Sequence, residues 1–163
     1  MHAVASTQPR IFTELQLAWI SLLSRYSFDW FATFTFRFDT HPEAAYKRFR
    51  YWVHVFNQSL HGRRYEKHGL GMHWVNALEW QRRGVVHFHA MLGDSRSLEE
   101  MAYKRAWKNF WYELAGFCDI QLIDDQVDVA AYVSKYVTKG GELELSANLA
   151  SYSQQYSLVS TRK

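Results

Sequence analysis

The sequence predicts a domain of the α+β class, in which helices pack on an antiparallel β-sheet. Segments with strand-like alternation separate segments with helical apolar spacing, and two of the strand-like segments flank a short polar connection. A length of 163 residues, 48% of them hydrophobic, suits one domain with a packed core. We expect a single domain over 1–163, with its core at about 29–139 and flexible ends at 1–10 and 140–163. For the Ser- and Gln-containing end, an ordered arm is the alternative to a loose tail.

Two helices are expected in the first part of the chain. Residues 11–25 carry apolar side chains at intervals of three and four, as one face of a helix would. These are Ile11, Phe12, Leu15, Trp19, Leu22 and Leu23. Residues 41–60 have Pro42 near a helix start and a second apolar stripe. That stripe consists of Tyr46, Phe49, Trp52, Val53 and Phe56.

Four segments have the pattern of strands. Residues 29–39 alternate between two faces. Phe34, Phe36 and Phe38 share one face, and Thr33, Thr35 and Arg37 share the other. Residues 71–80 and 85–92 flank the connection QRRG, which predicts an antiparallel hairpin. Residues 117–123 alternate as the fourth strand.

Two more helices complete the expected order. Residues 97–116 begin with the signals Ser97, Glu99 and Glu100 and stop at Gly116. The apolar positions of this helix are Met101, Trp107, Phe110, Trp111 and Leu114. Residues 125–141 form a helix that ends at two glycines. From residue 29 the order is βαββαβ plus a helix, which is the split βαβ, ferredoxin-like arrangement with a central antiparallel sheet.

Two histidines stand one residue apart in the otherwise apolar segment 85–92. Because strand side chains alternate between faces, His87 and His89 point the same way. If QRRG closes the hairpin, Glu79 lies opposite His87, and Gln81, which has the same facing, is an alternative partner. Two imidazoles and a carboxylate suit Mn²⁺ or Zn²⁺ better than Mg²⁺. Ordinary hydrogen-bonded core histidines are the other interpretation.

The last expected helix carries two tyrosines and two lysines. At 3.6 residues per turn these four fall within an arc of about 100°. They are Tyr132, Lys135, Tyr136 and Lys139, and the opposite side offers Ala130, Val133 and Val137 to the core. The polar arc indicates a site, and a surface helix with its tyrosines turned outward is the alternative.

The residue types of the strand and the helix fit one reaction. A tyrosine hydroxyl, with an ordinary pKa of about 10, is a weak nucleophile near neutral pH. A bound metal can polarise a phosphodiester, while an ammonium such as that of Lys135 or Lys139 stabilises developing negative charge. The pattern therefore indicates attack on DNA phosphate through a phosphotyrosine bond.

The stretches HFH and YVSKYVTK, with FATFTF upstream, resemble the HUH endonucleases, specifically the rolling-circle replication initiators of small plasmids and single-stranded DNA phages. The resemblance spans residues 29–139. It implies that His87 and His89 hold a divalent metal ion, Mn²⁺ or Mg²⁺, to which the hairpin register adds Glu79 as the preferred third ligand. It also implies that Tyr136 or Tyr132 cuts one DNA strand and stays joined to its 5′ phosphate. By the same resemblance Tyr136 initiates, and Tyr132 serves a second transfer.

The order of the motifs separates related classes. Conjugative relaxases carry the tyrosine before the histidine motif, whereas here the tyrosines follow it. HUH transposases of insertion sequences share this order and are the alternative enzyme class, although the small ones usually have one catalytic tyrosine. The expected substrate is single-stranded DNA at a replication origin. Because the sequence has no Walker A glycine loop, we expect a host helicase and polymerase to act with it.

A non-catalytic module that binds single-stranded nucleic acid is the second class of function. The three alternating phenylalanines of residues 29–39 could stack on bases, although such alternation more often marks a core. Basic residues could contact phosphate in either class. The foremost are Arg37, Arg82 and Arg83, followed by Arg63, Arg64 and Lys104.

Composition restricts the remaining classes. The sequence has no apolar run long enough for a membrane span and no apolar centre of a secretory signal near its start. The single cysteine, Cys118, excludes an internal disulfide and a thiolate zinc cluster. We therefore expect no membrane partner and a cytoplasmic location in a bacterial or archaeal cell. A net charge of +3 allows an acidic partner without requiring one.

Overall fold

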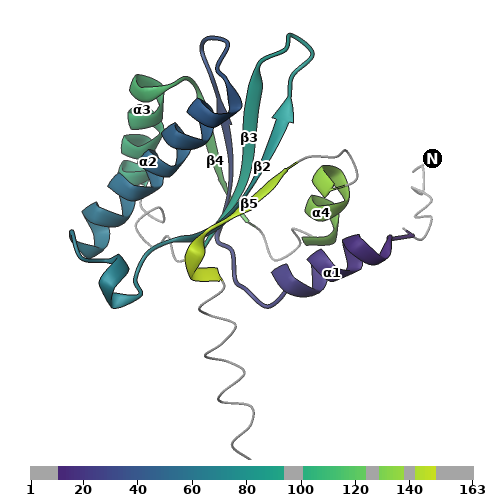
Figure 1. The fold of residues 1–163 in the computed structure, drawn as a ribbon. Helices are drawn as coiled ribbons and strands as arrows, with labels where there is room; N and C mark the ends of the chain where they lie inside the picture. Colours follow the sequence, from purple (N-terminus) through teal and green to yellow (C-terminus); the bar gives the residue numbers. More distant parts are fainter. Residues whose placement is uncertain (1–10, 94–100, 124–128, 138–141, 150–163) are drawn as a thin grey trace, which may run out of the picture.

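A computed structural model of the protein describes residues 11–93, 101–123, 129–137 and 142–149 (Figure 1). In these residues a sheet of five strands lies between two groups of helices, with α2 and α3 on one side and α1 and α4 on the other (Figure 1). The elements are α1 (Glu14–Leu23), β1 (Trp30–Thr35), α2 (Pro42–His61), the 3-10 helix η1 (Glu66–His68), β2 (His73–Trp80), β3 (Val86–Gly93), α3 (Met101–Leu114), β4 (Cys118–Leu122), α4 (Val129–Val137) and β5 (Leu143–Leu145).

The strand order is β4-β1-β3-β2-β5, and every neighbouring pair is antiparallel. The first four strands, with α2 and α3 as crossovers, form the arrangement that βαββαβ predicts, so the α+β prediction is confirmed. β5 is the addition. It pairs with the free edge of β2, so residues 143–145 form the ordered arm that the sequence left open as an alternative to a loose tail.

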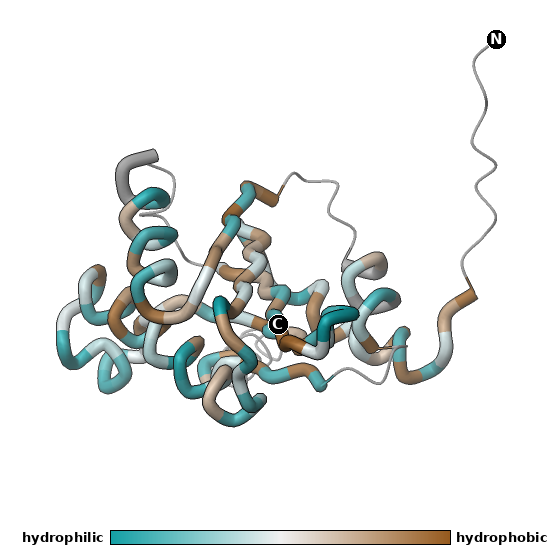
Figure 2. The backbone as a smooth tube through the Cα atoms, turned by 90° about the horizontal axis from the view of Figure 1, so that it is seen from above, coloured by the Kyte–Doolittle hydropathy of each residue, from teal (hydrophilic) through white to brown (hydrophobic). Residues whose placement is uncertain are grey.

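The face of the sheet toward α2 and α3 holds the larger hydrophobic core. β1 contributes Trp30, Ala32 and Phe34 to it, and α2 contributes the stripe that its helical spacing predicts. Seen from above, hydrophobic and hydrophilic residues interleave along the chain, as amphipathic elements require (Figure 2). Because successive strand side chains point to opposite faces, the residues between these buried ones face α1 and α4.

The opposite face holds a second cluster, which includes both tyrosines of α4. Tyr132 and Tyr136 are 5% and 3% exposed and pack with residues of α1, β2 and β3. Val137 packs against the same cluster, so the predicted division of this helix into a polar arc and a separate core side is wrong. The side chains of Ala130 and Val133 lie outside the described residues, as does Lys139.

The helix α1 buries only part of the predicted stripe, because Trp19 and Leu23 pack in the second cluster but other members do not. Thr13 caps it, with a reciprocal hydrogen bond to Gln16, and Gln16 is buried. Ile11 and Leu15, both expected in the stripe, are 95% and 60% exposed. Leu23 is fully buried as predicted. Apolar residues occur on several sides of this helix, so the spacing alone did not identify the side that packs.

The strand β1 is shorter than predicted. It ends at Thr35, and the backbone N–H of Arg37 donates to the carbonyl of Ala115, outside the ladder. Phe34 and Phe36 are buried, but Phe38 is 73% exposed, so the prediction that all three share a face is wrong at its last member. The two buried rings are core residues and leave no three-phenylalanine platform for bases.

The ends of the last two predicted helices lie partly outside the described residues, including Ser97, Glu99 and Glu100. α3 ends at Leu114, and a Cβ at Gly116 would collide with the carbonyl oxygen of Thr35. Gly116 is therefore needed for a close approach to β1 as well as for the end of the helix. None of the helices described here is long and apolar enough to cross a membrane.

Candidate metal and tyrosine site

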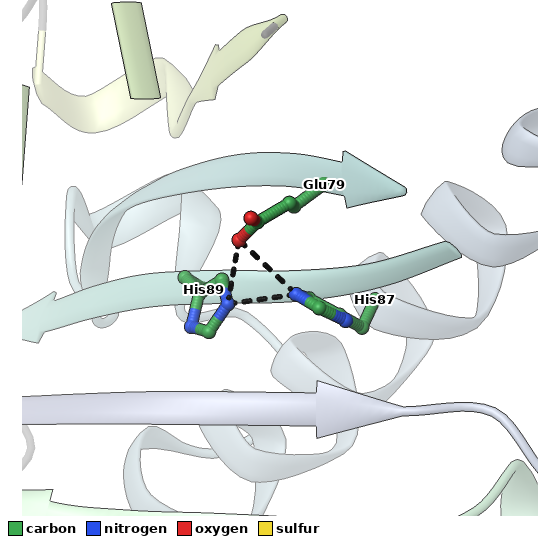
Figure 3. Close-up of side chains that lie close together, drawn as sticks. All are labelled: Glu79, His87 and His89. Carbon is green, nitrogen blue, oxygen red and sulfur yellow. Dashed lines mark hydrogen bonds and ion pairs between the residues drawn. The ribbon is translucent and has the colours of Figure 1, made fainter. Parts of the chain in front are cut away.

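Glu79, His87 and His89 lie close together on one face of the sheet (Figure 3). The helix α4 packs on the same face, where Tyr136 contacts His89. The hairpin register places Glu79 directly opposite His87, as the turn predicts. His89 follows two residues later and points to the same side. The Nε2 atoms of the histidines are 2.8 Å apart, and each lies 3.2 Å from Oε2 of Glu79. The three side chains thus present one ligand atom each to a common point.

The spacing of these atoms fits a divalent cation. Ligand atoms bound to one ion at about 2.0–2.2 Å lie roughly 3 Å apart in tetrahedral or octahedral geometry. Burial, with the charges of His87 and Lys135, lowers the pKa of His89 to about 4, so this imidazole keeps a free lone pair near neutral pH. Burial raises the pKa of Glu79, but the hydrogen bond with His87 and nearby positive charges outweigh it and hold this pKa below its ordinary value. The donor set is one carboxylate and two imidazoles.

Neighbouring side chains orient His89. Nδ1 of His89 lies 3.2 Å from the hydroxyl of Thr33 on β1, directly across the sheet. The ring of Phe31 stacks on the imidazole at 5.7 Å with an interplanar angle of 19°. A hydrogen bond to the second ring nitrogen fixes which nitrogen is available to a ligand. His89 is therefore held with Nε2 toward Glu79.

Tyr136 lies against the same imidazole. Its ring stacks on His89 at 5.0 Å and 27°, and Lys135 places its ammonium 5.0 Å from the Tyr136 ring centre. The Tyr136 hydroxyl is buried and has no hydrogen-bond partner among the described residues. Burial, with the charge of Glu79, raises the pKa of Tyr136 above its ordinary value. A phenol with an uncommitted hydroxyl thus lies beside the three potential ligands.

Tyr132 is engaged differently. Its hydroxyl donates to the carbonyl oxygen of His89 at 2.9 Å, and the Val75 carbonyl lies at 3.5 Å. Burial raises the pKa of Tyr132 well above its ordinary value, and the nearby Tyr136 adds to this. Tyr132 therefore braces the strand that carries His89, whereas the hydroxyl of Tyr136 is available for chemistry.

The remaining predicted site residues lie around the hairpin end of the sheet. Gln81 lies in the turn and accepts a hydrogen bond from Arg83 at 2.7 Å, so the alternative that it replaces Glu79 is not supported. Arg82 and Arg83 are exposed in that turn, near Glu79 in the sequence. Arg37 follows β1, and its side chain is directed toward α3. Its guanidinium donates to the Tyr112 carbonyl at 2.7 Å.

The part of this face over β1 and β4 carries residues that sequence reasoning did not single out. Thr35 pairs with His87, and Phe117 exchanges hydrogen bonds with Thr35. Phe117, Thr35, His87 and Glu79 therefore form a row across four neighbouring chain segments. With strands about 4.8 Å apart, Phe117 lies about 10 Å from His87. Phe117 is 62% exposed, so this row leads from an exposed aromatic ring to the three potential ligands.

Comparison with known proteins gives one positive result. The sequence model of the replication-associated protein ORF2 family matches residues 29–141, which is more than half of the chain and includes β1 to β4 and α4. Searches of curated proteins and of solved structures gave no significant match. The matched region contains Glu79, His87, His89 and both tyrosines of α4. The chain belongs to the replication-associated protein ORF2 family.

Proposed function

We propose that the protein is a metal-dependent endonuclease and strand transferase of the HUH type, which starts rolling-circle replication by nicking single-stranded DNA at an origin. The observation that carries this proposal is the contact of Tyr136 with the three-ligand cluster. Its ring stacks on His89, and its hydroxyl has no partner among the described residues. Family membership supports a role in replication, and the geometry supports the chemistry.

Each residue has a defined part in the reaction. A divalent ion held by Glu79, His87 and His89, Mn²⁺ or Mg²⁺, would supply Lewis acidity to a non-bridging phosphate oxygen. The oxygen of Tyr136 forms a bond to phosphorus while the bond from phosphorus to O3′ breaks. The phenolic proton is released to solvent, and O3′ takes up a proton to become a hydroxyl. Lys135 provides positive charge beside the tyrosine as negative charge develops.

The covalent product explains why a tyrosine is used. The 5′ phosphate stays bonded to the protein, so the energy of the phosphodiester is retained and a later O3′ can displace the tyrosine. Lys139, which follows α4 in the sequence, is proposed as a second ammonium. Arg82 and Arg83 are proposed to contact DNA phosphates from the hairpin turn, because both are exposed at the end of β2 that carries Glu79. Arg37, next to Tyr112, is proposed as a more distant contact.

The two tyrosines receive different roles. Tyr136 is proposed as the initiating nucleophile, because its hydroxyl is uncommitted and its ring contacts His89. A second transfer by Tyr132 stays a prediction, since its hydroxyl would first have to leave the His89 carbonyl. A host helicase and polymerase, acting in the cytoplasm of a bacterial or archaeal cell, complete the proposal.

Covalent trapping tests this function. Labelled random single-stranded oligonucleotides are incubated with the protein and Mn²⁺, and protein–DNA adducts are separated on denaturing gels and sequenced. The wild type should give an adduct with 5′ phosphate ends, Tyr136→Phe should give none, and the matched variant Tyr132→Phe should still give it. An adduct in the double variant would refute tyrosine catalysis. Oligonucleotide that is bound but never cut would instead favour a pure binding module.

A further inference from the structure

A cavity of about 750 Å³ lies between α2, the loop around η1 and the segment 144–148. None of its lining residues belongs to the metal and tyrosine site. Its size is within the roughly 300–1,000 Å³ of pockets that hold small molecules. Part of the lining is apolar or aromatic, as a planar ligand requires. That part consists of Val53, Tyr65, Leu70, Met72, Trp74 and Leu145.

A donor and an acceptor lie side by side in this cavity. Nε of Arg50 is 3.2 Å from Oε1 of Glu144, which leaves the rest of the guanidinium and Oε2 of the carboxylate for other partners. Oε2 of Glu144 is buried and has no hydrogen-bond partner among the described residues, and the same holds for Oδ1 of Asn148. Buried polar atoms without partners are rare in folded proteins. The lining therefore presents one cationic donor and two acceptors whose partners are missing.

A hydrogen-bond chain connects three residues of the lining. The hydroxyl of Tyr65 donates to Glu66 at 3.0 Å, and Nδ1 of His54 lies 2.9 Å from the Tyr65 oxygen. The hydroxyl has one proton, so its oxygen accepts from Nδ1–H of His54. The other ring nitrogen, Nε2, is then left for a further partner. The partnerless acceptors Glu144 Oε2 and Asn148 Oδ1 therefore favour a ligand edge that carries N–H groups.

The loop beside the cavity is basic. Residues 62–70 contribute Tyr65, Glu66, Gly69 and Leu70 to the lining. The same loop exposes Arg63, Arg64, Lys67 and His68 to solvent. Exposed lysines and arginines next to a pocket favour a ligand that carries phosphate.

We propose that this cavity binds a guanine base, with its phosphates at the basic loop. The edge of guanine carries one acceptor, O6, and two donors, N1–H and N2–H₂, which complement the one donor, Arg50, and the two acceptors, Glu144 and Asn148, of the lining. Adenine, cytosine and thymine each carry only one donor group on this edge, so each would leave one of the two acceptors without a partner. The base belongs to the substrate strand, away from the cut, if the proposed function holds.

Binding without metal tests the cavity separately from catalysis. Fluorescence anisotropy in EDTA would measure the affinity for labelled oligo-dT with one central dG, dA or dC, and for oligo-dT alone. The dG oligonucleotide should bind about tenfold more tightly than the other three. Glu144→Gln and Arg50→Gln should each abolish that preference. The exposed Glu43 and Arg48 on α2 offer the matched controls Glu43→Gln and Arg48→Gln, which should keep it.

The outcomes separate the two proposals and the two sources of guanine. Equal binding of all four oligonucleotides, or a dG preference that survives Glu144→Gln and Arg50→Gln, would overturn the guanine site. Competition by free dGMP as strong as by the dG oligonucleotide would support the site and assign a free nucleotide to it. Weak competition by dGMP would support a base within the strand. Because the assay needs no cleavage, Tyr136→Phe should show the same preference even if nicking is never observed.

Discussion

The two faces of the sheet use aromatic rings for different purposes. On the α2 and α3 face, Phe34 contacts Phe49, Trp52 and Trp111, with ring centres 4.8–5.3 Å apart in edge-on geometry. On the other face, Phe31 and Tyr136 both stack on the imidazole of His89. The first arrangement excludes polar groups and stabilises the fold. The second holds a polar group in place. We therefore expect substitutions on one face to change stability and on the other to change chemistry.

The largest expected effect is on catalysis. His87→Ala or His89→Ala removes one of two imidazole ligands, and nicking of single-stranded DNA should fall at least about 10³-fold, since metal chemistry supplies several kcal/mol of stabilisation. Thermal unfolding should change much less, because the rings are held by neighbours and do not fill the main core. Nicking rates with Mn²⁺ and circular dichroism melts provide the measurement. Wild-type rates in both variants would remove the metal assignment.

Truncation of a ring on the α2 and α3 face should instead lower the stability of the fold. Phe34→Ala deletes a fully buried ring from the large core and should reduce the free energy of unfolding by about 3–5 kcal/mol. The neighbouring exposed Phe38, which is 73% exposed, offers the matched control Phe38→Ala, with a change within about 0.5 kcal/mol. Urea denaturation compares the two. A similar cost for both would contradict the assignment of Phe34 to the core and Phe38 to the surface.

The third effect concerns the carboxylate of the cluster. Glu79→Ala should weaken Mn²⁺ binding by at least about tenfold, because a charged ligand is lost, whereas Gln81→Ala should change it little. The structure explains the difference, since Gln81 bonds Arg83 in the turn. Calorimetric titration with Mn²⁺ gives both affinities. If Gln81→Ala had the greater effect, the third ligand would be reassigned.

How far the sequence predicts this molecule depends on whether the pattern is local. The register of Glu79 against His87 follows from a short turn between them, and it is confirmed. The stripe of α2 follows from strong periodicity within one helix, and it is confirmed as well. Both are determined by neighbours in the chain.

The features that sequence reasoning missed depend on distant pairing. Thr33 bonds His89 only because β1 lies beside β3, and β5 is a strand because β2 offers a free edge. Phe117 enters the row of the site through its hydrogen bonds with Thr35, 82 residues away in sequence. Periodicity carries no information on such register. The contrast between Tyr132 and Tyr136 also depends on tertiary contacts. The two residues are one helical turn apart, but the Tyr132 hydroxyl donates to the His89 carbonyl and the Tyr136 hydroxyl has no partner among the described residues.

The row that runs from Phe117 to Glu79 predicts that a change at Phe117 has a moderate effect on substrate binding. Phe117→Ala should raise KM for single-stranded DNA about tenfold and leave kcat largely unchanged, because base stacking on an aromatic ring contributes about 1–3 kcal/mol. Phe117→Trp should restore binding. Tyr51 is similarly exposed, at 52%, but lies on α2, so Tyr51→Ala is the matched control and should leave KM near the wild-type value. Equal effects of both alanine variants would remove Phe117 from the path of the strand.

The smallest expected effect distinguishes the two tyrosines by stability alone. Tyr132→Phe deletes a hydroxyl that donates to the His89 carbonyl at 2.9 Å, and it should cost about 1 kcal/mol, or roughly 2–4 °C in Tm. Tyr136→Phe deletes a hydroxyl without a partner among the described residues, so its Tm should equal or slightly exceed that of the wild type. Calorimetry of both variants in EDTA excludes any contribution from metal. The variant that is neutral for stability should be the one that loses the covalent adduct, because an uncommitted hydroxyl is the one available for chemistry. A larger loss of Tm in Tyr136→Phe would mean that its hydroxyl is bonded and would reverse the roles proposed for the pair.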